Sequence, residues 1–575
     1  MNFFLGILRR SKSFVIQHPV LCGFYVLTLI LFLLNARYVD YPDEYVNLLA
    51  GKSILNFEFP YQDVWDHHLP GAWYLSAPLL LLSGGSFAIF RILWALFTYV
   101  GLMGVSYVIG HEEPRFHRYY MVFFLAYPMA ALYFWFHLFL ADSLAVFFFT
   151  VAFWLLVQRM IHPAKTLKSY FLISFLIFAM IFSSATFLYL GAALYLWLAY
   201  LVFSNPRYRE LKHVKHLDKH RNVNVAKLIG VSFVPYGLYA LLLMITGTLD
   251  DFYFANLTYN TTLYINISNY VRGSAFNPLK FALTIIANFY DGYLPLLSKI
   301  KHLDLYLPVG TLAGLSTLTL MLLMLGRSWI LGIIYFFVLS FSAPRSNIQN
   351  YKETDYQAAM FLVLGLASAL VVLYLLENEE RRNGLVADLK RVSRLIVGVF
   401  LLFTMIFLAY NSFSKGFQIY SQKLPAISNR GEASGFIDEF VGTNEIYFVG
   451  PYEPHEAFYV KNGQLPGKYV SLLPQFRESD YIKSDFLSEF EQNPPKIILF
   501  KQQSSIFGTP AVVFGKFLYD WMNAGRYTQL EKVEGIQILR QPTGYDLKTD
   551  LFIHNVQRDE ILHDLVDRGY ILISS

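Results

Sequence analysis

The hydrophobic pattern of the chain is a series of long apolar stretches separated by polar loops. An α-helix needs about 20 apolar residues to cross the hydrocarbon core of a bilayer. On this basis the pattern predicts eleven membrane-spanning helices within residues 1–413. The predicted spans are 14–34, 86–109, 119–136, 143–158, 169–183, 187–203, 228–246, 305–325, 329–342, 357–376 and 395–413.

One further apolar stretch, LKFALTIIANFYDGYLPLLS at 279–298, is not counted as a span. It carries Asn288, Asp291 and Pro295, which are unfavourable within a lipid-exposed helix. We therefore expect an interfacial or re-entrant helix there.

The distribution of Lys and Arg predicts the orientation of the chain. If the N-terminus is cytoplasmic, the predicted cytoplasmic segments hold 21 Lys and Arg in 77 residues, whereas the outer segments before residue 357 hold 8 in 129. This asymmetry follows the positive-inside rule. Counting 279–298 as a span would reverse the orientation of all later segments across the membrane. The basic segment ENEERRNGLVADLKRVSR would then lie outside. The N-terminus is thus predicted to be a cytoplasmic, uncleaved signal anchor of a multi-pass plasma-membrane protein.

Composition supports this interpretation and excludes other classes. The chain is 55% hydrophobic and 15% charged, with a mean hydropathy of +0.41, which is typical of a polytopic membrane protein rather than a soluble one. The net charge of +5 is dispersed over short loops, which argues against nucleic-acid binding. Cys22 is the single cysteine, so the chain has neither an intrachain disulfide nor a Cys-rich metal site.

An odd number of spans places residues 414–575 on the extracytoplasmic side. This segment alternates short apolar strands, EIYFVG, KIILF and GIQILR, with the helical stretches DYIKSDFLSEFEQ and VVFGKFLYDWMNAG. A further helix is expected at RDEILHDLVDRG and a further strand at YILIS. The pattern predicts a C-terminal extracytoplasmic α/β domain, whose simplest role is structural or in docking the acceptor.

The first outer loop, residues 35–85, opens with the acidic sequence DYPDEYVN. Pro42 suits the first position of a helix, and Asp43 and Glu44 then occupy its first turn, where the helix dipole favours carboxylates. This structural interpretation explains the composition without any chemistry. The alternative is that the carboxylates act on a substrate at the outer membrane surface.

The longer stretch 40–84 carries a series of motifs. Asp43-Glu44 opens a predicted helix, a PYQD element follows at 60–63, a DHHLP element at 66–70, and then an aromatic-rich helix. This order resembles the first outer loop of GT-C glycosyltransferases, and in particular bacterial members related to protein mannosyltransferases, lipid A aminoarabinose transferases and rhizobial lipopolysaccharide transferases. The resemblance implies a GT-C-like fold and the transfer of a sugar from a polyprenyl-phosphate donor to an acceptor on the extracytoplasmic face.

The resemblance also implies roles for the acidic residues. Asp43 matches the family's catalytic aspartate and is expected to take the proton from the acceptor hydroxyl in a single, inverting displacement. Glu44 is expected to orient Asp43 or to cap the helix. Asp142 matches a second acidic residue that binds the acceptor or holds the base, although a helix N-cap is an equally good interpretation of it.

The departing phosphate needs positive charge. The candidates are Arg345, which suits bidentate phosphate contact, then Lys352 and His68, and Arg91 near the outer end of the second span. Arg345 and Arg91 can alternatively anchor helix ends at the membrane surface. The chain departs from the family at His68-Leu69, where a Lys is usual before the Pro. It departs again at SSAT (183–186), where some relatives have a basic residue.

Two other functions remain open from the sequence, a secondary transporter and a non-catalytic membrane scaffold of GT-C type. The expected partners of the enzyme are a polyprenyl-phosphate-linked sugar, a glycan, lipid or protein acceptor, and the bilayer. A divalent metal is a possible cofactor, but no residue is assigned to it, because DVWDHH is interpreted as a hydrogen-bonded turn rather than a metal site. The sequence does not identify the sugar or the acceptor.

Overall fold

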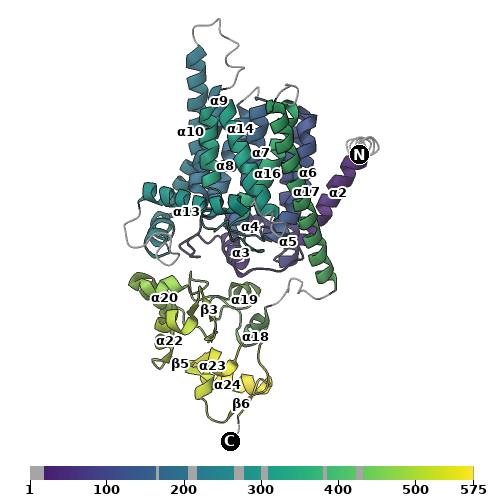
Figure 1. Cartoon of the computed structure of the whole chain (residues 1–575). Coiled ribbons are helices and arrows are strands. Elements are labelled where there is room, and N and C mark those ends of the chain that lie inside the picture. Colours follow the sequence, from purple (N-terminus) through teal and green to yellow (C-terminus); the bar gives the residue numbers. More distant parts are fainter. Residues whose placement is uncertain are drawn as a thin grey trace, which may run out of the picture. The chain divides into compact units, whose positions relative to one another are not determined.

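The computed structural model describes residues 19–163, 167–204, 217–264, 277–299, 308–379, 385–421 and 431–573 (Figure 1). The chain divides into two compact units. We call the first, residues 1–39, 88–239 and 278–427, the helical unit. We call the second, residues 40–87, 240–277 and 428–575, the loop–domain unit. The predicted domains, 1–413 and 414–575, stay a prediction.

Each predicted span overlaps a helix in the described part of the chain, while residues 14–18 and 305–307 of the predicted spans lie outside the described residues. The helices are α2 (Pro19–Asn35), α5 (Phe87–Glu112), α6 (Pro114–Tyr133), α7 (Ala141–Ile161), α8 (Lys168–Ser183), α9 (Leu188–Ser204), α10 (Leu217–Thr246), α14 (Pro308–Arg327), α15 (Trp329–Ser340), α16 (Ala359–Glu379) and α17 (Leu385–Tyr420). A short 3₁₀ turn, η1 (Ala185–Phe187), precedes α9.

Seven helices in the described part of the chain are long and apolar enough to cross a membrane: α5, α7, α9 with its preceding turn, α10, α14, α16 and α17. Helices α2, α8 and α15 are apolar but shorter. The predicted fold class, a polytopic α-helical membrane protein with a C-terminal α/β domain, is confirmed. The number of spans and their orientation stay predictions.

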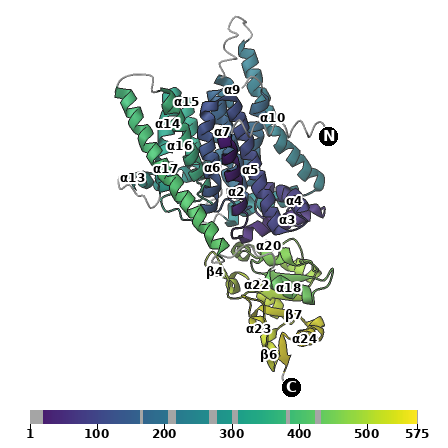
Figure 2. The same ribbon diagram turned by 90° about the vertical axis from the view of Figure 1, so that its right-hand side faces the viewer.

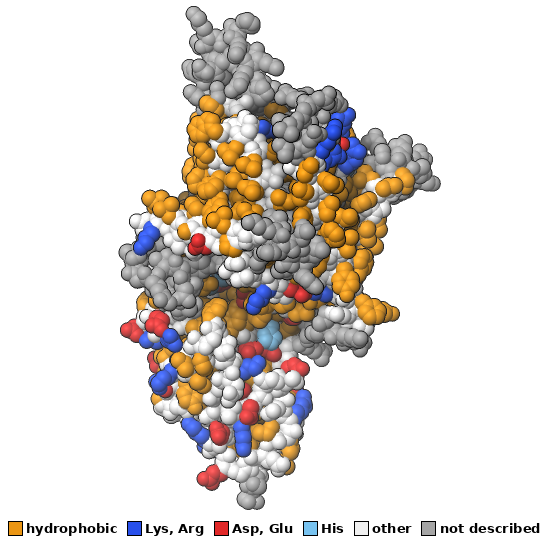
Figure 3. All heavy atoms as spheres, in the orientation of Figure 1, with side chains coloured by type: hydrophobic (Ala, Val, Ile, Leu, Met, Phe, Trp, Pro, Cys, Tyr) orange, Lys and Arg blue, Asp and Glu red, His pale blue; other side chains and the backbone are white. Residues whose placement is uncertain are grey.

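Burial separates central helices from peripheral ones. The most apolar stretches of α7 and α16 are 83% and 94% buried, whereas those of α10 and α17 are 17% and 28% buried. The exposed residues of α10 and α17 are large and apolar, for example Phe233, Ile245 and Phe413. Apolar side chains accordingly cover the visible face of the helical unit in Figure 3. Such a surface is suited to lipid rather than water.

Small residues allow close packing in the centre of the helical unit, where α14 and α16 lie side by side (Figures 1 and 2). A Cβ atom added to Gly365 would lie 2.3 Å from the Cβ of Ala313. Ser316 on α14 donates a hydrogen bond of 2.7 Å to the carbonyl of Gly365 on α16. Small side chains and interhelical hydrogen bonds are the usual means by which helices associate in a membrane.

The stretch that was not counted as a span forms helix α13 (Pro278–Lys299). It packs against α14 and α15, and the hydroxyl of Tyr293 donates to the carbonyl of Gly314 at 2.9 Å. It is not among the seven candidate spans of the described residues. Its interfacial position stays a prediction.

In the loop–domain unit, residues 40–87 form two short helices, α3 (Pro42–Leu55) and α4 (Gly71–Ser83), which pack against each other. Gly51 is required at their contact, because a Cβ atom there would lie 2.0 Å from Oγ of Ser76. Ser76 on α4 donates a hydrogen bond of 2.8 Å to the carbonyl of Asn47 on α3, and this bond links the two helices. The same unit contains α11 (Leu249–Tyr253) and a π-helix, η3 (Phe254–Tyr264).

The C-terminal part is an α/β fold around a four-stranded sheet in the order β1-β2-β7-β5. Strand β1 runs parallel to β2, with Tyr447 opposite Ile497, and β7 is antiparallel to both β2 and β5. The strands are β1 (Tyr447–Gly450), β2 (Ile497–Phe500), β3 (Ser505–Ile506), β4 (Thr509–Pro510), β5 (Tyr527–Gln529), β6 (Ile536–Ile538), β7 (Leu551–His554) and β8 (Ile571–Ile573). The helices are α18 (Glu432–Phe440), α19 (Pro454–Tyr459), α20 (Asp480–Gln492), α21 (Ala511–Phe514), α22 (Lys516–Asn523), α23 (Leu547–Asp550) and α24 (Arg558–Asp567), with 3₁₀ turns η5 (Pro474–Glu478), η6 (Leu530–Lys532) and η7 (Asn555–Gln557).

Glu489 on α20 gives the stability of this fold a pH dependence. Burial raises the pKa of Glu489 to about 7, with Lys468 lowering it and Asp485 raising it. The usual pKa of a glutamate in an unfolded chain is about 4.3. The folded state therefore binds more protons between these values, so the contribution of Glu489 to stability is complete below about pH 4.3 and is lost as pH rises through about 7.

We expect Glu489→Gln to remove that part of the pH dependence, because the amide is neutral at every pH. The measurement is the unfolding temperature of the full chain in detergent at pH 5 and pH 8, compared between the two proteins. The variant should lose less stability than the natural chain on going to pH 8. Equal losses would contradict the assignment.

Candidate active site

Glu44 stabilises the start of α3. The helix begins at Pro42, and Tyr41 at its N-cap donates its backbone N–H to Oε2 of Glu44 at 3.2 Å. The Glu44 side chain is fully buried. A residue at the third helical position that accepts from the N-cap N–H is half of a capping box. The expected capping contact of Glu44 is thus present.

Asp43 is held by a tyrosine from the C-terminal fold. Its Oδ1 accepts a hydrogen bond of 2.7 Å from the hydroxyl of Tyr452, which lies 409 residues later, just after β1. Burial, and next the charge of Asp43, raise the pKa of Tyr452 well above its usual value. Tyr452 therefore keeps its proton and acts as a donor to Asp43 at neutral pH. Inside α3, the carbonyl of Asp43 accepts from the side chain of Asn47 at 3.1 Å.

Aromatic packing fixes α3 against α19 within the same unit. Tyr45 is buried, and its ring contacts Phe458 and Tyr459 of α19 at 5.6 and 5.8 Å between centroids. Its hydroxyl donates to Oδ2 of Asp40 and lies 3.4 Å from the hydroxyl of Tyr459. The first turn of α3, which carries Asp43, is therefore positioned both by the hydrogen bond from Tyr452 and by the packing of Tyr45 against α19.

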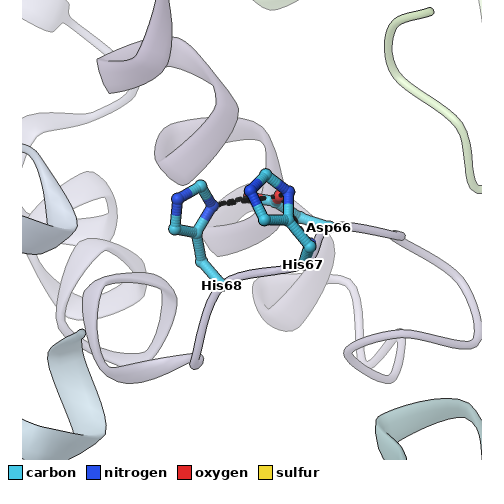
Figure 4. A group of neighbouring side chains, drawn as sticks. All are labelled: Asp66, His67 and His68. Atoms are coloured by element: carbon cyan, nitrogen blue, oxygen red, sulfur yellow. Dashed lines mark hydrogen bonds and ion pairs between the residues drawn. The ribbon is translucent and has the colours of Figure 1, made fainter. Parts of the chain in front are cut away.

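Asp66, His67 and His68 converge in the loop before α4 (Figure 4). Nδ1 of His67 lies 3.0 Å from Oδ1 of Asp66, and Nδ1 of His68 lies 3.0 Å from Oδ2 of the same carboxylate. Burial opposes ionisation of Asp66, but the adjacent His68 and His67 outweigh it and lower the pKa of Asp66 well below its usual value. Asp66 is thus a carboxylate with a histidine on each oxygen.

In the helical unit, Asp142 and Arg345 form an ion pair, although 203 residues separate them. Asp142 is 4% exposed, and its other oxygen accepts from Oγ of Ser184 at 2.8 Å. Ser184 belongs to the SSAT segment, where the basic residue of some relatives is missing. Helix α7 has Leu140 at its N-cap, and Asp142 lies within the first turn. The alternative interpretation of Asp142 as an N-cap is therefore wrong.

The other two basic candidates of the helical unit lie in different environments. Arg91 is 1% exposed and donates to the carbonyls of Tyr38 and Val39 at 3.0 and 3.4 Å. These contacts tie the start of α5 to the backbone directly before the acidic loop. Lys352 is exposed in the loop before α16. The roles of both residues in phosphate binding stay predictions.

Lys415 is a buried cation that the sequence reasoning missed. It lies on α17, forms an ion pair with Glu353, and its Nζ stands 5.3 Å and 5.6 Å from the ring centroids of Tyr38 and Tyr133. A single Lys just beyond the predicted end of a span gives no signal of burial. Its partners come from three distant parts of the chain.

No protein-family model and no curated protein sequence matches the chain. Among solved structures, two of ArnT from Cupriavidus metallidurans are similar. The apo structure shares 11% identity over 96% of this chain and 99% of ArnT, with a TM-score of 0.46. The structure bound to undecaprenyl phosphate shares 13% identity over 93% and 98%, with a TM-score of 0.48. ArnT is a lipid A aminoarabinose transferase, one of the groups named in the predicted resemblance. These alignments assign no role to any residue of this chain.

Proposed function

We propose that the chain is an inverting glycosyltransferase that moves a sugar from a polyprenyl-phosphate donor to an acceptor hydroxyl on the extracytoplasmic face of the membrane. The observation that carries the proposal is the setting of Asp43. It is a carboxylate at the start of a short helix, oriented by Tyr452, in a chain with seven described helices that are long and apolar enough to cross a membrane. A base for a membrane-bound substrate needs this combination.

In this proposal Asp43 takes the proton from the acceptor hydroxyl as its oxygen attacks the anomeric carbon. The bond from carbon to the phosphate oxygen breaks in the same step, and the polyprenyl phosphate leaves. A carboxylate accepts several hydrogen bonds, so the bond from Tyr452 orients one oxygen while the group keeps the capacity to accept an acceptor hydroxyl. Glu44 positions Asp43 through the start of α3.

The phosphate needs compensating charge, and Arg345 is the first candidate, because a guanidinium binds two phosphate oxygens at once. In the proposal its ion pair with Asp142 holds the guanidinium ready for the donor. Asp142 then acts through Arg345 or by binding the acceptor. Lys352, His68 and Arg91 are further candidates for the phosphate.

We expect Tyr452→Phe to lower the turnover number of transfer about tenfold and to leave the Michaelis constant for the donor nearly unchanged. A hydrogen bond to a charged group is worth about 1.5–3 kcal/mol, and here its loss frees the carboxylate to leave its reactive position. The matched control is Tyr459→Phe, which removes a hydroxyl near Tyr45 rather than near Asp43. Equal effects of the two variants would contradict the role of Tyr452.

The experiment that tests the function has two steps. First, lipid that copurifies with the full chain is extracted and identified by mass spectrometry, and undecaprenyl phosphate and its sugar conjugates are the first species to seek. Second, the identified donor is mixed with the protein and candidate acceptors, and the release of free polyprenyl phosphate is followed. Release coupled to a glycosylated acceptor supports the proposal. Movement of the donor or sugar across liposomes without transfer supports a transporter, and tight binding without either supports a scaffold.

A further inference from the structure

Asp66, His67 and His68 offer a set of metal ligands, of which the proposed reaction uses only His68, as one of its further candidates for the phosphate. One carboxylate and two imidazole nitrogens lie within 4.8 Å of one another. Two ligands at tetrahedral angles around Zn²⁺, with bonds of about 2.0–2.1 Å, lie about 3.3 Å apart. The two nitrogen–oxygen separations here are each 3.0 Å. The three groups are therefore near the spacing at which one small cation can bind them together.

The backbone of this loop is held by hydrogen bonds at Trp65, His67 and His68. Trp65 donates its N–H to the carbonyl of Lys468 at 2.9 Å. The carbonyl of His67 accepts from the side chain of Asn260, and that of His68 from the hydroxyl of Tyr61, each at 2.9 Å. Ligands that are held in place before binding lose little entropy when the metal arrives, and such outer contacts strengthen metal sites. A hydrogen-bonded surface turn does not need this support.

Charge supplies a reason for a cation at this position. Residues 40–87 contain six Asp and Glu residues and a single Lys, Lys52. Asp66 lies close enough to Tyr452 for its charge to act on that hydroxyl, and Tyr452 is bonded to Asp43. A phosphate approaching Asp43 therefore meets a surplus of negative charge from this segment. A divalent ion on Asp66 would offset it.

We propose that Asp66, His67 and His68 bind one divalent transition-metal ion, of the Zn²⁺ or Mn²⁺ class, and that this ion binds the phosphate of the lipid donor. Two imidazoles and one carboxylate are the donor set that such ions prefer, whereas Mg²⁺ prefers oxygen alone. Three protein ligands leave a coordination position for a phosphate oxygen. The His68 side chain is 37% exposed, so the cluster is accessible from one side. The second half of the proposal rests on the proposed function, whereas the first half does not.

The first experiment measures the metal alone. The full chain, purified without a histidine tag and treated with a chelator, is titrated with Zn²⁺, Mn²⁺ and Mg²⁺, and bound metal is determined by calorimetry and elemental analysis. We expect one Zn²⁺ or Mn²⁺ per chain and much weaker Mg²⁺ binding. Asp66→Asn and His68→Ala should each lower the affinity at least tenfold. His563→Ala is the matched control, because His563 forms an Asp–His pair with Asp567 at 3.1 Å on α24 of the same unit, where both side chains are exposed.

Because Asp66 is buried, the unfolding temperature of each variant is measured without metal. His68 is more exposed than Asp66, so its replacement should disturb folding less. Absence of stoichiometric binding, or equal affinity in His68→Ala and His563→Ala, would overturn the metal site. The second experiment adds a short-chain polyprenyl phosphate to the Mn²⁺-loaded protein and records relaxation of its ³¹P signal. Enhanced relaxation that His68→Ala abolishes supports the phosphate role. Metal binding without that enhancement overturns this role, and leaves the glycosyltransferase proposal to be decided by the transfer assay.

Discussion

Asp43→Asn is expected to reduce the turnover number of the proposed sugar transfer about 10²–10⁴-fold, the range that a positioned general base contributes. Asparagine has nearly the same shape and can still accept the hydrogen bond from Tyr452, but it cannot take a proton from the acceptor. The Michaelis constant for the donor should change less, because the proton moves only in the transition state. Initial rates are measured with the identified donor and acceptor.

The matched control for this variant is Asp250→Asn. Asp250 is an exposed carboxylate in the first turn of α11, so it shares with Asp43 the favourable interaction with a helix dipole of about 0.3–1 kcal/mol. We expect its removal to leave transfer unchanged. If Asp43→Asn and Asp250→Asn behave alike, with small stability losses and unaltered turnover, Asp43 is a helix-start residue and not the base.

Arg345→Ala is expected to impair both stability and donor binding. It leaves the Asp142 carboxylate buried without its cation, and breaking a buried ion pair costs about 3–5 kcal/mol. It also removes the guanidinium proposed to bind the donor phosphate. The measurements are the unfolding temperature of the full chain in detergent and the affinity for polyprenyl phosphate.

A double variant separates these two effects. Asp142→Asn combined with Arg345→Gln replaces the ion pair by two neutral polar groups and leaves no unpaired buried charge, which should recover most of the stability. Donor affinity should stay low, because the positive charge is still missing. Arg159→Ala is the control: it breaks the Arg159–Glu112 pair of the same unit, and should lower stability without affecting donor affinity. Full recovery of donor binding in the double variant would show that Arg345 is structural.

The hydrophobic pattern predicted the helices well, because lipid imposes a length and an apolar composition that can be read from the chain. The predicted stretch 143–158 lies within α7, and the predicted stretch 357–376 covers α16 from its start at Ala359; these are the two most buried of the seven candidate spans. The pattern was less informative in the C-terminal part. Helix α20 was predicted at its observed bounds, but the central strand β7, with the sequence LFIH, was missed. Four residues are too few to show a strand period.

Local chemistry of the site could be predicted, and its long-range partners could not. Pro42 predicted the helix start that places Asp43 and Glu44, because proline is favoured at the first helical position. Tyr452 stands in a loop after β1 and has no motif around it. The sequence predicted Asp142 and Arg345 as separate site residues. It did not predict that they form an ion pair, because 203 residues separate them and only the fold brings them together. Lys415 was missed for the same reason, because its partners Glu353, Tyr38 and Tyr133 lie far from it in the sequence.

The hydrogen bond between Asp43 and Tyr452 limits how segments of this protein can be exchanged with those of another protein of similar fold. A chimera that exchanges residues 40–87 alone would separate the Asp43 carboxylate from the Tyr452 hydroxyl that donates to it. Truncation before residue 431 would have the same consequence, even if the helices still inserted. The two segments depend on each other through this hydrogen bond, so an exchange with another protein of this fold should move both together.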